Sequence, residues 1–340
     1  MKKLDYVQWD ITSRCNLNCL HCREKVVEDI KDDLNIDECK KLIDQVQSFN
    51  THTLSIAGGE PLLSPNIKEV LYYAKGKFKR LVISSNGTIM SDDILKTIKE
   101  CVTNVQISLD GPTEEIHDRM RGRGVFKKAI NTIKLLQKNN IKVGIRLTLC
   151  DFNKSLVREY VDLALELGLK DAYLRRIIPS GNAQKNSLLP LSSNELKSVL
   201  GDAISYGKSK GIHVASADYF CQIEFNDEAR KKAKSISDLN GQVIGGCAVG
   251  INSFFVMQDG VLVYCPYLPV FCGDLRQETL EQIWDNSEMF KVARSIRHNL
   301  KGKCSICTYK FSCGGCRAYA YATTGDILAS DDGCWIDKPK

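Results

Sequence analysis

A regular alternation of strand-like and helix-like segments up to about residue 215 restricts the fold of this chain more than any other feature. Runs rich in β-branched and aromatic residues predict six strands, at residues 5–11, 52–58, 80–87, 104–111, 142–149 and 172–178. Amphipathic segments between them predict helices that begin at the capping residues Asn35, Ser64, Ser91 and Ser155. Such alternation indicates an α/β fold with a parallel sheet, whose site lies at the carboxyl ends of the strands.

This rhythm ends after Gly211. Residues 226–241 are polar and charged and predict a linker or an exposed helix. From Cys247 onward the chain reads as short strands, turns and cysteines, with one helix near residues 278–296. We therefore expect a barrel domain over residues 1–215, a bridging region over 216–246 and a small cysteine-rich module over 247–340.

The cysteine content indicates metal chemistry. The chain has 340 residues, of which 15 are cysteines. No apolar run has the length of a secretory signal at the amino terminus, and no segment approaches the length of a membrane span. We expect a cytoplasmic protein without a membrane partner. Because cytosolic thiols stay reduced, this many cysteines point to metal binding or catalysis rather than to disulfides.

Three of the cysteines stand in the loop after the first predicted strand, in the segment SRCNLNCLHC: Cys15, Cys19 and Cys22. A structural zinc site usually has four protein ligands, and this loop supplies three. A 4Fe-4S cluster held by three thiolates keeps one iron open, and that iron can bind a substrate or a cofactor. The loop therefore predicts a reactive cluster, with a zinc-binding loop as the alternative.

The motif CNLNCLHC resembles the Cys-x3-Cys-x2-Cys signature of the radical S-adenosylmethionine (SAM) enzymes. This resemblance implies a partial (β/α)6 barrel and a 4Fe-4S cluster whose open iron chelates the amino and carboxylate groups of SAM. It also implies that one electron from the cluster cleaves SAM to methionine and a 5'-deoxyadenosyl radical. The six strand-helix units counted above agree with such a barrel.

Short segments after the later strands resemble the parts of that family that contact SAM. AGGEPLL would supply close backbone contacts and an acceptor for the SAM ammonium, and HDRMRG an arginine for the SAM carboxylate. SSNG and SLDG would supply short polar side chains. The resemblance implies a cofactor-binding set of Gly58, Gly59, Glu60, Asn86, Ser108 and Arg121. Asp110 is expected to cap a turn, and His21 to pack near the cluster without binding it. No general acid, base or hydrogen donor is identified.

The carboxyl-terminal cysteines resemble the SPASM extension of radical SAM enzymes, which carries two auxiliary 4Fe-4S clusters. This resemblance assigns Cys247, Cys265 and Cys316 to a first auxiliary cluster. A second cluster takes Cys304, Cys307, Cys313 and Cys334, although the short CGGC spacing makes the division of Cys313 and Cys316 less secure. Cys272 is the candidate fourth ligand of the first cluster, with Cys221 or an open iron as alternatives. Two zinc sites are the competing interpretation of the module.

The remaining cysteines and two arginines have simpler expected positions. Cys39, Cys101 and Cys150 lie in helix or strand patterns and are expected to be small buried side chains. Arg175 and Arg176 end the sixth predicted strand, where alternation sends neighbouring side chains to opposite faces. One of the two is therefore expected to reach the pocket.

These expectations lead to a radical SAM/SPASM enzyme that abstracts a substrate hydrogen. Oxidative modification of a ribosomal peptide or protein is the first choice, and decarboxylation or side-chain remodelling of a tetrapyrrole in alternative haem synthesis is the alternative. An iron-sulfur electron carrier without enzymatic activity is the second alternative. Because the first predicted strand begins at residue 5, we expect no amino-terminal leader-peptide-binding domain before the barrel. Expected partners are the substrate, a flavodoxin- or ferredoxin-type electron donor and, for a peptide substrate, a separate leader-peptide-binding protein.

The formal net charge of +6 does not indicate nucleic-acid binding. That sum counts every cysteine as neutral, whereas cysteines bind metal as thiolates. Ten bound thiolates around three dipositive cluster cores remove about four charges, which leaves a nearly balanced protein. We therefore expect a solvated surface and no nucleic-acid partner.

Overall fold

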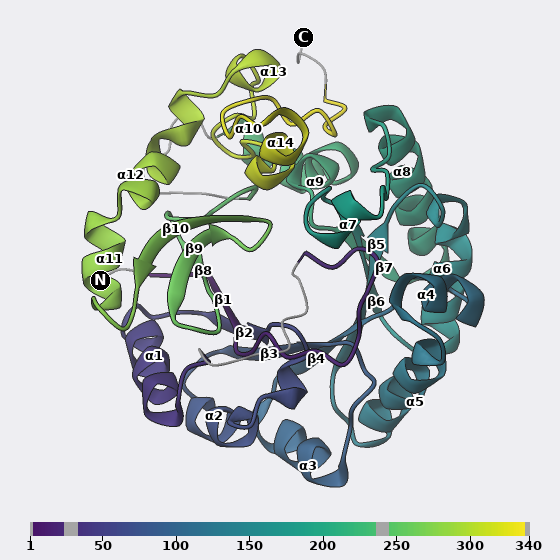
Figure 1. The fold of residues 1–340 in the computed structure, drawn as a ribbon. Coiled ribbons are helices and arrows are strands. Elements are labelled where there is room, and N and C mark those ends of the chain that lie inside the picture. Colours follow the sequence, from purple (N-terminus) through teal and green to yellow (C-terminus); the bar gives the residue numbers. More distant parts are fainter. Residues whose placement is uncertain (1–2, 24–32, 236–244, 337–340) are drawn as a thin grey trace.

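One curved sheet organises the molecule. The computed structural model describes residues 3–23, 33–235 and 245–336. Ten strands form the sheet in the order β10-β9-β8-β1-β2-β3-β4-β5-β6-β7. Figure 1 shows the sheet curving into an open barrel with helices on its outer side. The six predicted strands are confirmed and all run parallel: β1 (Tyr6–Asp10), β2 (Thr53–Ala57), β3 (Arg80–Ser85), β4 (Asn104–Ser108), β5 (Val143–Leu149) and β6 (Asp171–Arg176).

Helices lie on the outside of the barrel: α1 (Ile36–Ser48), α2 (Ile67–Ala74), α3 (Asp92–Cys101), α4 (Glu114–Arg121), α5 (Val125–Lys138), α6 (Val157–Glu166) and α8 (Ser193–Lys210). The short helix α7 (Asn182–Lys185) lies instead at the mouth of the barrel (Figure 1). Helix α1 begins as predicted, because Asn35 accepts from the backbone of Glu38, whose side chain bonds back to Asn35. Ser91 likewise caps α3. Among the described residues, no helix is long and apolar enough to cross a membrane.

Two predicted caps are wrong, because short 3-10 turns precede the helices concerned. Ser64 ends the 3-10 turn Pro61–Leu63, and α2 begins only after Asn66. Ser155 lies inside the turn Lys154–Leu156, so its side chain does not cap α6. These turns move the start of α2 by two residues and that of α6 by one, without changing the order of the elements.

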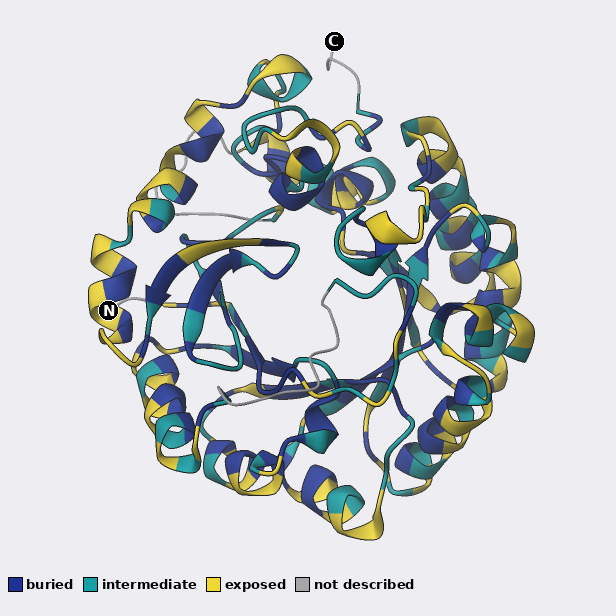
Figure 2. Cartoon of the chain, viewed as in Figure 1, coloured by how far each residue is buried: buried dark blue, intermediate teal, exposed yellow. Residues whose placement is uncertain are grey.

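The core lies between the helices and the sheet. In α1 the buried side chains Cys39, Leu42, Ile43 and Val46 follow helical spacing and form one face. Figure 2 shows the same division around the barrel, with buried faces toward the strands and exposed faces outward. Each large aliphatic side chain removed from water in this way stabilises the fold by about 1.5–3 kcal/mol. Burial of these side chains therefore holds the helices against the sheet.

The later part of the chain extends the barrel sheet at both edges. Strand β7 (His213–Ser216) pairs in parallel with β6 and runs across the boundary expected at residue 215. At the other edge β8 (Ser253–Val256) pairs in parallel with β1, and β9 (Val261–Cys265) and β10 (Leu268–Asp274) continue antiparallel. The helices of this part are α9 (Tyr219–Phe225), α10 (Asp227–Lys234), α11 (Leu280–Asn286), α12 (Glu288–Ser295), α13 (Gly302–Ser305) and α14 (Arg317–Thr324).

The elements predicted in this part are only partly as expected. Helix α10 falls in the segment predicted as a linker or an exposed helix, whereas residues 236–244 lie outside the described residues. The single helix predicted near residues 278–296 is two helices, α11 and α12, because Ser287 ends the first and caps the second. The pairing of β8, β9 and β10 with the barrel strand β1 nevertheless joins this module to the barrel in one continuous sheet.

A buried ion cluster fastens this module to the barrel. Arg176, at the end of β6, donates two hydrogen bonds to the carboxylate of Asp331, at 2.8 and 2.6 Å. Its Nε lies 2.9 Å from Asp218, and all three side chains are less than 10% exposed. Loss of one partner of a buried ion pair costs much free energy, and here two parallel hydrogen bonds join the guanidinium to the carboxylate. This cluster therefore fixes the module against the carboxyl end of β6.

Replacement of Asp331 by Asn is expected to lower the free energy of unfolding by about 3 kcal/mol, because it leaves the Arg176 charge with one carboxylate in a buried site. Guanidinium unfolding of the anaerobically prepared protein measures this change. Asp202→Asn is the matched control, since Asp202 pairs with Arg158 at the surface and its loss costs at most about 1 kcal/mol. Equal stabilities of the two variants would contradict the proposed role of the cluster.

Candidate functional site

The amino-terminal cysteines lie in one loop at the carboxyl ends of the barrel strands. The loop follows β1 and is held in place from two sides, because Leu20 N donates to Met120 O at 2.9 Å and Asn182 N donates to Cys22 O at 2.7 Å. Cys15, Cys19 and Cys22 line a cavity of about 180 Å³ in the mouth of the barrel. The structure therefore brings together the three residues predicted to hold the reactive cluster.

The two glycines after β2 pack this loop against the barrel. A Cβ on Gly58 would lie 2.4 Å from Thr12 O, and one on Gly59 would lie 2.3 Å from Arg14 O. Gly58 also has a φ of +135°, which side-chain-bearing residues rarely adopt. Both glycines line the cavity, as predicted for a close ligand approach. Their closest approach, however, is to the backbone that leads into the cysteine loop.

Glu60 turns into the protein and not toward the cavity. Its side chain is fully buried and accepts from Asn86 N at 2.7 Å, Ser85 Oγ at 2.9 Å and Leu62 N at 3.3 Å. Burial raises the pKa of this carboxyl to about 7, against the opposing effect of these donors. In this arrangement Glu60 joins the ends of β2 and β3, and its contact with a SAM ammonium stays a prediction.

Asn86 and Ser108, the polar residues expected after β3 and β4, both line the cavity. Asn86 Nδ2 donates to Asn16 Oδ1 of the cysteine loop at 3.0 Å, and Asn86 Oδ1 accepts from Thr88 N at 2.9 Å. Asn86 therefore positions the loop as well as facing the cavity.

Arg121 reaches the cavity from the end of α4. Its Nε donates to Asp110 Oδ2 at 2.6 Å, and its Nη1 lies 3.8 Å from Cys19 Sγ. Asp110 is fully buried, and although burial opposes its ionisation, the charges of Arg121 and His21 lower its pKa to about 2. His21 Nε2 lies 3.4 Å from Asp110, whereas burial lowers the pKa of His21 to about 4.

Asp110 has a larger role than the turn cap predicted from the sequence. It also accepts from Thr148 N at 2.7 Å, so that one carboxylate joins α4 to β5 and fixes the direction of Arg121. The sequence contained a signal for this role, because Asp110 follows a strand and precedes an arginine-rich helix. Its partner Thr148 lies on the next strand and is brought near only by the sheet.

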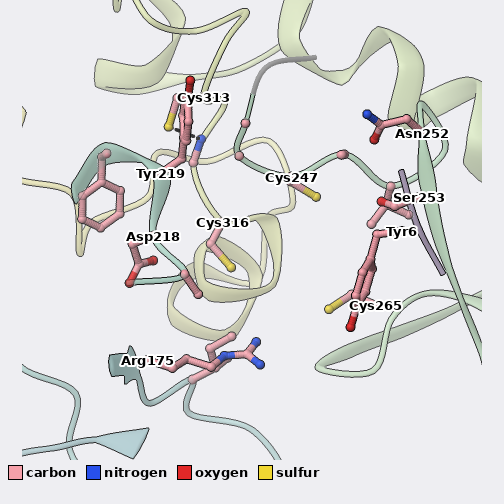
Figure 3. A pocket seen from close by; sticks show the side chains of 18 of the residues that line it. Tyr6, Arg175, Asp218, Tyr219, Cys247, Asn252, Ser253, Cys265, Cys313 and Cys316 are labelled. Atoms are coloured by element: carbon pink, nitrogen blue, oxygen red, sulfur yellow. Dashed lines mark hydrogen bonds between the residues drawn. The ribbon is translucent and has the colours of Figure 1, made fainter. Parts of the chain in front are cut away.

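Four of the carboxyl-terminal cysteines line a second cavity of about 430 Å³ between the barrel and the module: Cys247, Cys265, Cys313 and Cys316. Figure 3 shows the first two and Cys316 around one part of this cavity, with Cys313 beside Tyr219. Electrostatic interactions link Cys265 to Cys247 and Cys316 to Cys265. This group of three is the set predicted for the first auxiliary cluster.

A second group gathers behind it. Cys313 interacts electrostatically with Cys334, Cys334 with Cys304, and Cys307 with Cys304. These are the four cysteines predicted for the second auxiliary cluster. Cys313 interacts with Cys334 but also lines the larger cavity together with Cys316. The division of Cys313 and Cys316 between the two clusters stays a prediction.

Neither cysteine considered as a fourth ligand of the first cluster lies with that group. Cys272 is buried on β10, where its Sγ lies 3.6 Å from Val270 O. Cys221 is buried in α9 and faces the side of α8 and β7. The described residues lining the larger cavity include neither of them. The fourth ligand of the first auxiliary cluster therefore stays a prediction.

The chemistry of these thiols fits a bound iron-sulfur core. Burial raises the pKa of Cys19 to about 11 and those of Cys316 and Cys334 to about 12, so a cation is needed to hold them as thiolates at neutral pH. Among the described residues, no three Cys, His, Asp or Glu side chains meet closely enough to bind a single ion. In a four-iron cluster each cysteine binds a different iron, so its ligands do not need to meet at one point.

Arg175 lies between the two cavities and lines both of them. Its guanidinium carbon stands 4.4 Å from the ring centre of Tyr267, which belongs to the turn between β9 and β10. Arg176 forms the ion cluster with Asp331 and also lines the larger cavity, so that only Arg175 of the two reaches the smaller cavity at the barrel mouth. Arg146, on β5, faces the smaller cavity as well.

Comparison with known families agrees with both halves of this geometry. Residues 9–164 match the model of the radical SAM superfamily, which covers the cysteine loop and most of the barrel. Residues 247–308 match the SPASM model, described as an iron-sulfur cluster-binding domain.

Full-length relatives and solved structures extend the comparison. An AdoMet-dependent heme synthase of Methanosarcina barkeri is 32% identical over 96% of this chain and 95% of the relative. The mycofactocin maturase MftC of Mycobacterium tuberculosis is 26% identical over 96% of this chain and 81% of the relative. Streptococcus suis SuiB bound to its precursor peptide SuiA has the same fold, with a TM-score of 0.81 at 16% identity, over 98% of this chain and 76% of that one.

Replacement of Cys19 by Ala is expected to remove about four of about twelve irons per chain after anaerobic reconstitution, because it removes a ligand of the amino-terminal group only. Iron and sulfide assays measure the change. Cys101→Ala is the matched control, since Cys101 is a buried cysteine outside all three groups. A wild-type content near four irons would contradict the assignment of the carboxyl-terminal cysteines.

The geometry and the comparisons lead to one assignment. A parallel barrel carries three cysteines at its mouth, and a module with two further cysteine groups continues its sheet. Matches to both family models and a full-length relative at 32% identity share this organisation. The chain therefore belongs to the radical SAM superfamily, with a carboxyl-terminal SPASM domain, and is an enzyme that binds SAM and 4Fe-4S clusters.

Proposed function

We propose that this enzyme oxidatively decarboxylates the propionate side chains of an iron-containing tetrapyrrole. The observation that carries the proposal is the similarity over nearly the whole of both chains to an AdoMet-dependent heme synthase. A pre-heme d1 synthase of Dinoroseobacter shibae, 27% identical over 97% of this chain and 86% of the relative, supports the same substrate class. With this support we propose the tetrapyrrole first, which was the alternative in the expectation from the sequence.

Two arginines beside the cavities support a substrate with several carboxylates. Arg146 and Arg175 have no carboxylate partner among the described residues, and they face the same space at the barrel mouth. Burial lowers the pKa of Arg146, and the charge of Arg175 lowers it further. A carboxylate bound between the two guanidiniums would relieve this repulsion through charge-assisted hydrogen bonds.

The reaction removes one hydrogen atom, one electron and CO2 from each propionate, which becomes a vinyl group. When bound, SAM and its cluster supply the radical that takes the hydrogen atom, and oxidised auxiliary clusters accept the electron released as CO2 leaves. The residues of the chain hold and orient the substrate. Arg146 and Arg175 would bind propionates, and the Tyr267 ring against Arg175 would limit the movement of that guanidinium.

The cofactor complement of this proposal is three 4Fe-4S clusters and one SAM. Cys15, Cys19 and Cys22 would hold the cluster that binds SAM, and the two groups in the module would hold the auxiliary clusters. An open iron in the first auxiliary cluster would face the larger cavity, where a substrate group can reach it. A flavodoxin- or ferredoxin-type protein would supply the electron that starts each turnover.

Peptide modification is the second candidate. It is favoured by the similarity of the chain to MftC and to the subtilosin biosynthesis protein AlbA of Bacillus subtilis, which is 28% identical over 92% of this chain and 66% of the relative. For this candidate a separate leader-peptide-binding protein would be the natural partner.

Incubation of the reconstituted enzyme with SAM, dithionite and iron-coproporphyrin is expected to yield 5'-deoxyadenosine together with a lighter porphyrin. Each step lowers the porphyrin mass by one CO2 and two hydrogen atoms, which mass spectrometry resolves. The control omits SAM. Formation of 5'-deoxyadenosine with an unchanged porphyrin, and a loss of two hydrogen atoms from a candidate peptide, would favour the second candidate instead.

Replacement of Arg175 by Gln, or of Arg146 by Gln, is expected to raise the KM for the porphyrin roughly ten- to a hundredfold, because each variant loses charge-assisted hydrogen bonds to a propionate. Steady-state rates at varied porphyrin concentration measure the effect. Arg158→Gln serves as control, since Arg158 forms a surface pair with Asp202. If KM does not change in either cavity variant, the arginines do not bind the substrate carboxylates.

A further inference from the structure

Arg297 occupies an unusual position between the two cysteine groups of the module. It lies in the short 3-10 turn Ile296–His298 after α12 and is only 2% exposed. Its Nη2 donates to the carbonyl oxygens of Cys247 at 2.9 Å and Cys313 at 3.3 Å, and also to Gly245 O at 3.3 Å. Cys247 belongs to the first group of cysteines and Cys313 to the second, so one guanidinium touches both.

No carboxylate neutralises this buried charge within the described part of the chain. Arg297 has no ion pair there, and its Nη1 is buried without a hydrogen-bond partner. Arg176, by contrast, has two carboxylates in a similarly buried site. A buried cation without a counter-charge is strongly unfavourable, so the site indicates that negative charge normally lies close to Arg297.

The nearest sources of negative charge are the cysteines themselves. The thiolates of Cys247 and Cys313 both favour the charged form of Arg297, against burial and the nearby cation Arg317. Iron-sulfur clusters held by three or four thiolates carry net negative charge, which becomes larger on reduction. The charged form of Arg297 is therefore stabilised by the negative charge of a cluster on either side, and most strongly when that cluster is reduced.

We infer that Arg297 is the counter-charge shared by the two auxiliary clusters, and that it raises the reduction potentials of both so that they can accept the substrate electron. Arg297 acts as a positioning residue, because it touches ligand backbones and not the substrate. The inference rests on the two auxiliary clusters proposed above and is independent of the substrate class.

Hydrogen bonds to the sulfurs act in the same direction. Tyr264 Oη lies 3.5 Å from Cys247 Sγ in the first group. In the second group Tyr309 N donates to Cys307 Sγ and Gly315 N donates to Cys313 Sγ, both at 3.4 Å. Each donor stabilises negative charge on one cluster, whereas Arg297 is close to both. Its removal should therefore shift two potentials together, which distinguishes it from these single donors.

The test is a redox titration monitored by electron paramagnetic resonance on full-length protein. Cys15, Cys19 and Cys22 are replaced by Ala in every sample, so that only the auxiliary clusters contribute to the signal. Iron is assayed first, and about eight atoms per chain are expected. Arg297→Gln then removes the charge, Arg297→Lys keeps it, and Arg294→Gln is a control on the preceding helix, where Arg294 binds Gly250 O and Trp284 O.

In Arg297→Gln, both midpoint potentials are expected to fall, whereas Arg297→Lys and Arg294→Gln stay near the parent values. If Arg297→Gln loses its iron while Arg297→Lys keeps it, the shared counter-charge is also supported. Unchanged potentials in a fully loaded Arg297→Gln protein would overturn the inference. Loss of iron in both Arg297 variants would overturn it too. The role of Arg297 would then be to hold the loop backbones by its hydrogen bonds to carbonyl oxygens, and not to supply charge. A parent protein without iron would remove the auxiliary clusters themselves, and with them this inference.

Discussion

The contact of Arg176 with Asp331 and Asp218 is the interaction on which the arrangement of the site depends. It ties the end of β6 to the carboxyl-terminal module in a place where water cannot replace a lost partner. Asp331 Oδ2 also accepts from the backbone N–H of Cys316 at 2.8 Å. The same carboxylate thus holds both the barrel strand and one cysteine of the first auxiliary group.

This attachment explains why the two cavities adjoin. Arg176 enters the buried ion cluster at the edge of the larger cavity, and strand alternation turns Arg175 to the opposite face of β6, where it lines both cavities. The continuous pairing of β8 with β1 closes the other side, and the turn between β9 and β10 brings Tyr267 over Arg175. A substrate at the barrel mouth is therefore close to both the cysteine loop and the first auxiliary group, an arrangement that suits hydrogen abstraction followed by transfer of one electron.

The strands of the barrel were predictable because most are short runs rich in β-branched or aromatic residues between amphipathic segments. Helix α4 was not predicted, because EEIHDRMR is so polar that only His117 and Met120 are buried in it, although it carries Arg121. The inward turn of Glu60 depends on Ser85 and Asn86 from the next strand, and the partners of Arg176 lie far away in the sequence. Cys272 resembles a ligand by its spacing, but it lies on β10 and is not among the described residues that line the larger cavity. Local sequence patterns identified candidate ligands and polar side chains, whereas tertiary contacts decide which of these residues lie together.

The most direct test of this account is a diffraction experiment on anaerobically prepared crystals, with anomalous maps calculated at the iron and zinc edges. The account predicts three iron peaks: one beside Cys15, Cys19 and Cys22, one beside Cys247, Cys265 and Cys316, and one among Cys304, Cys307, Cys313 and Cys334. It also predicts that Arg297 lies between the last two peaks. A single iron peak in the barrel with zinc in the module, or an iron cluster bound by Cys272, would contradict it.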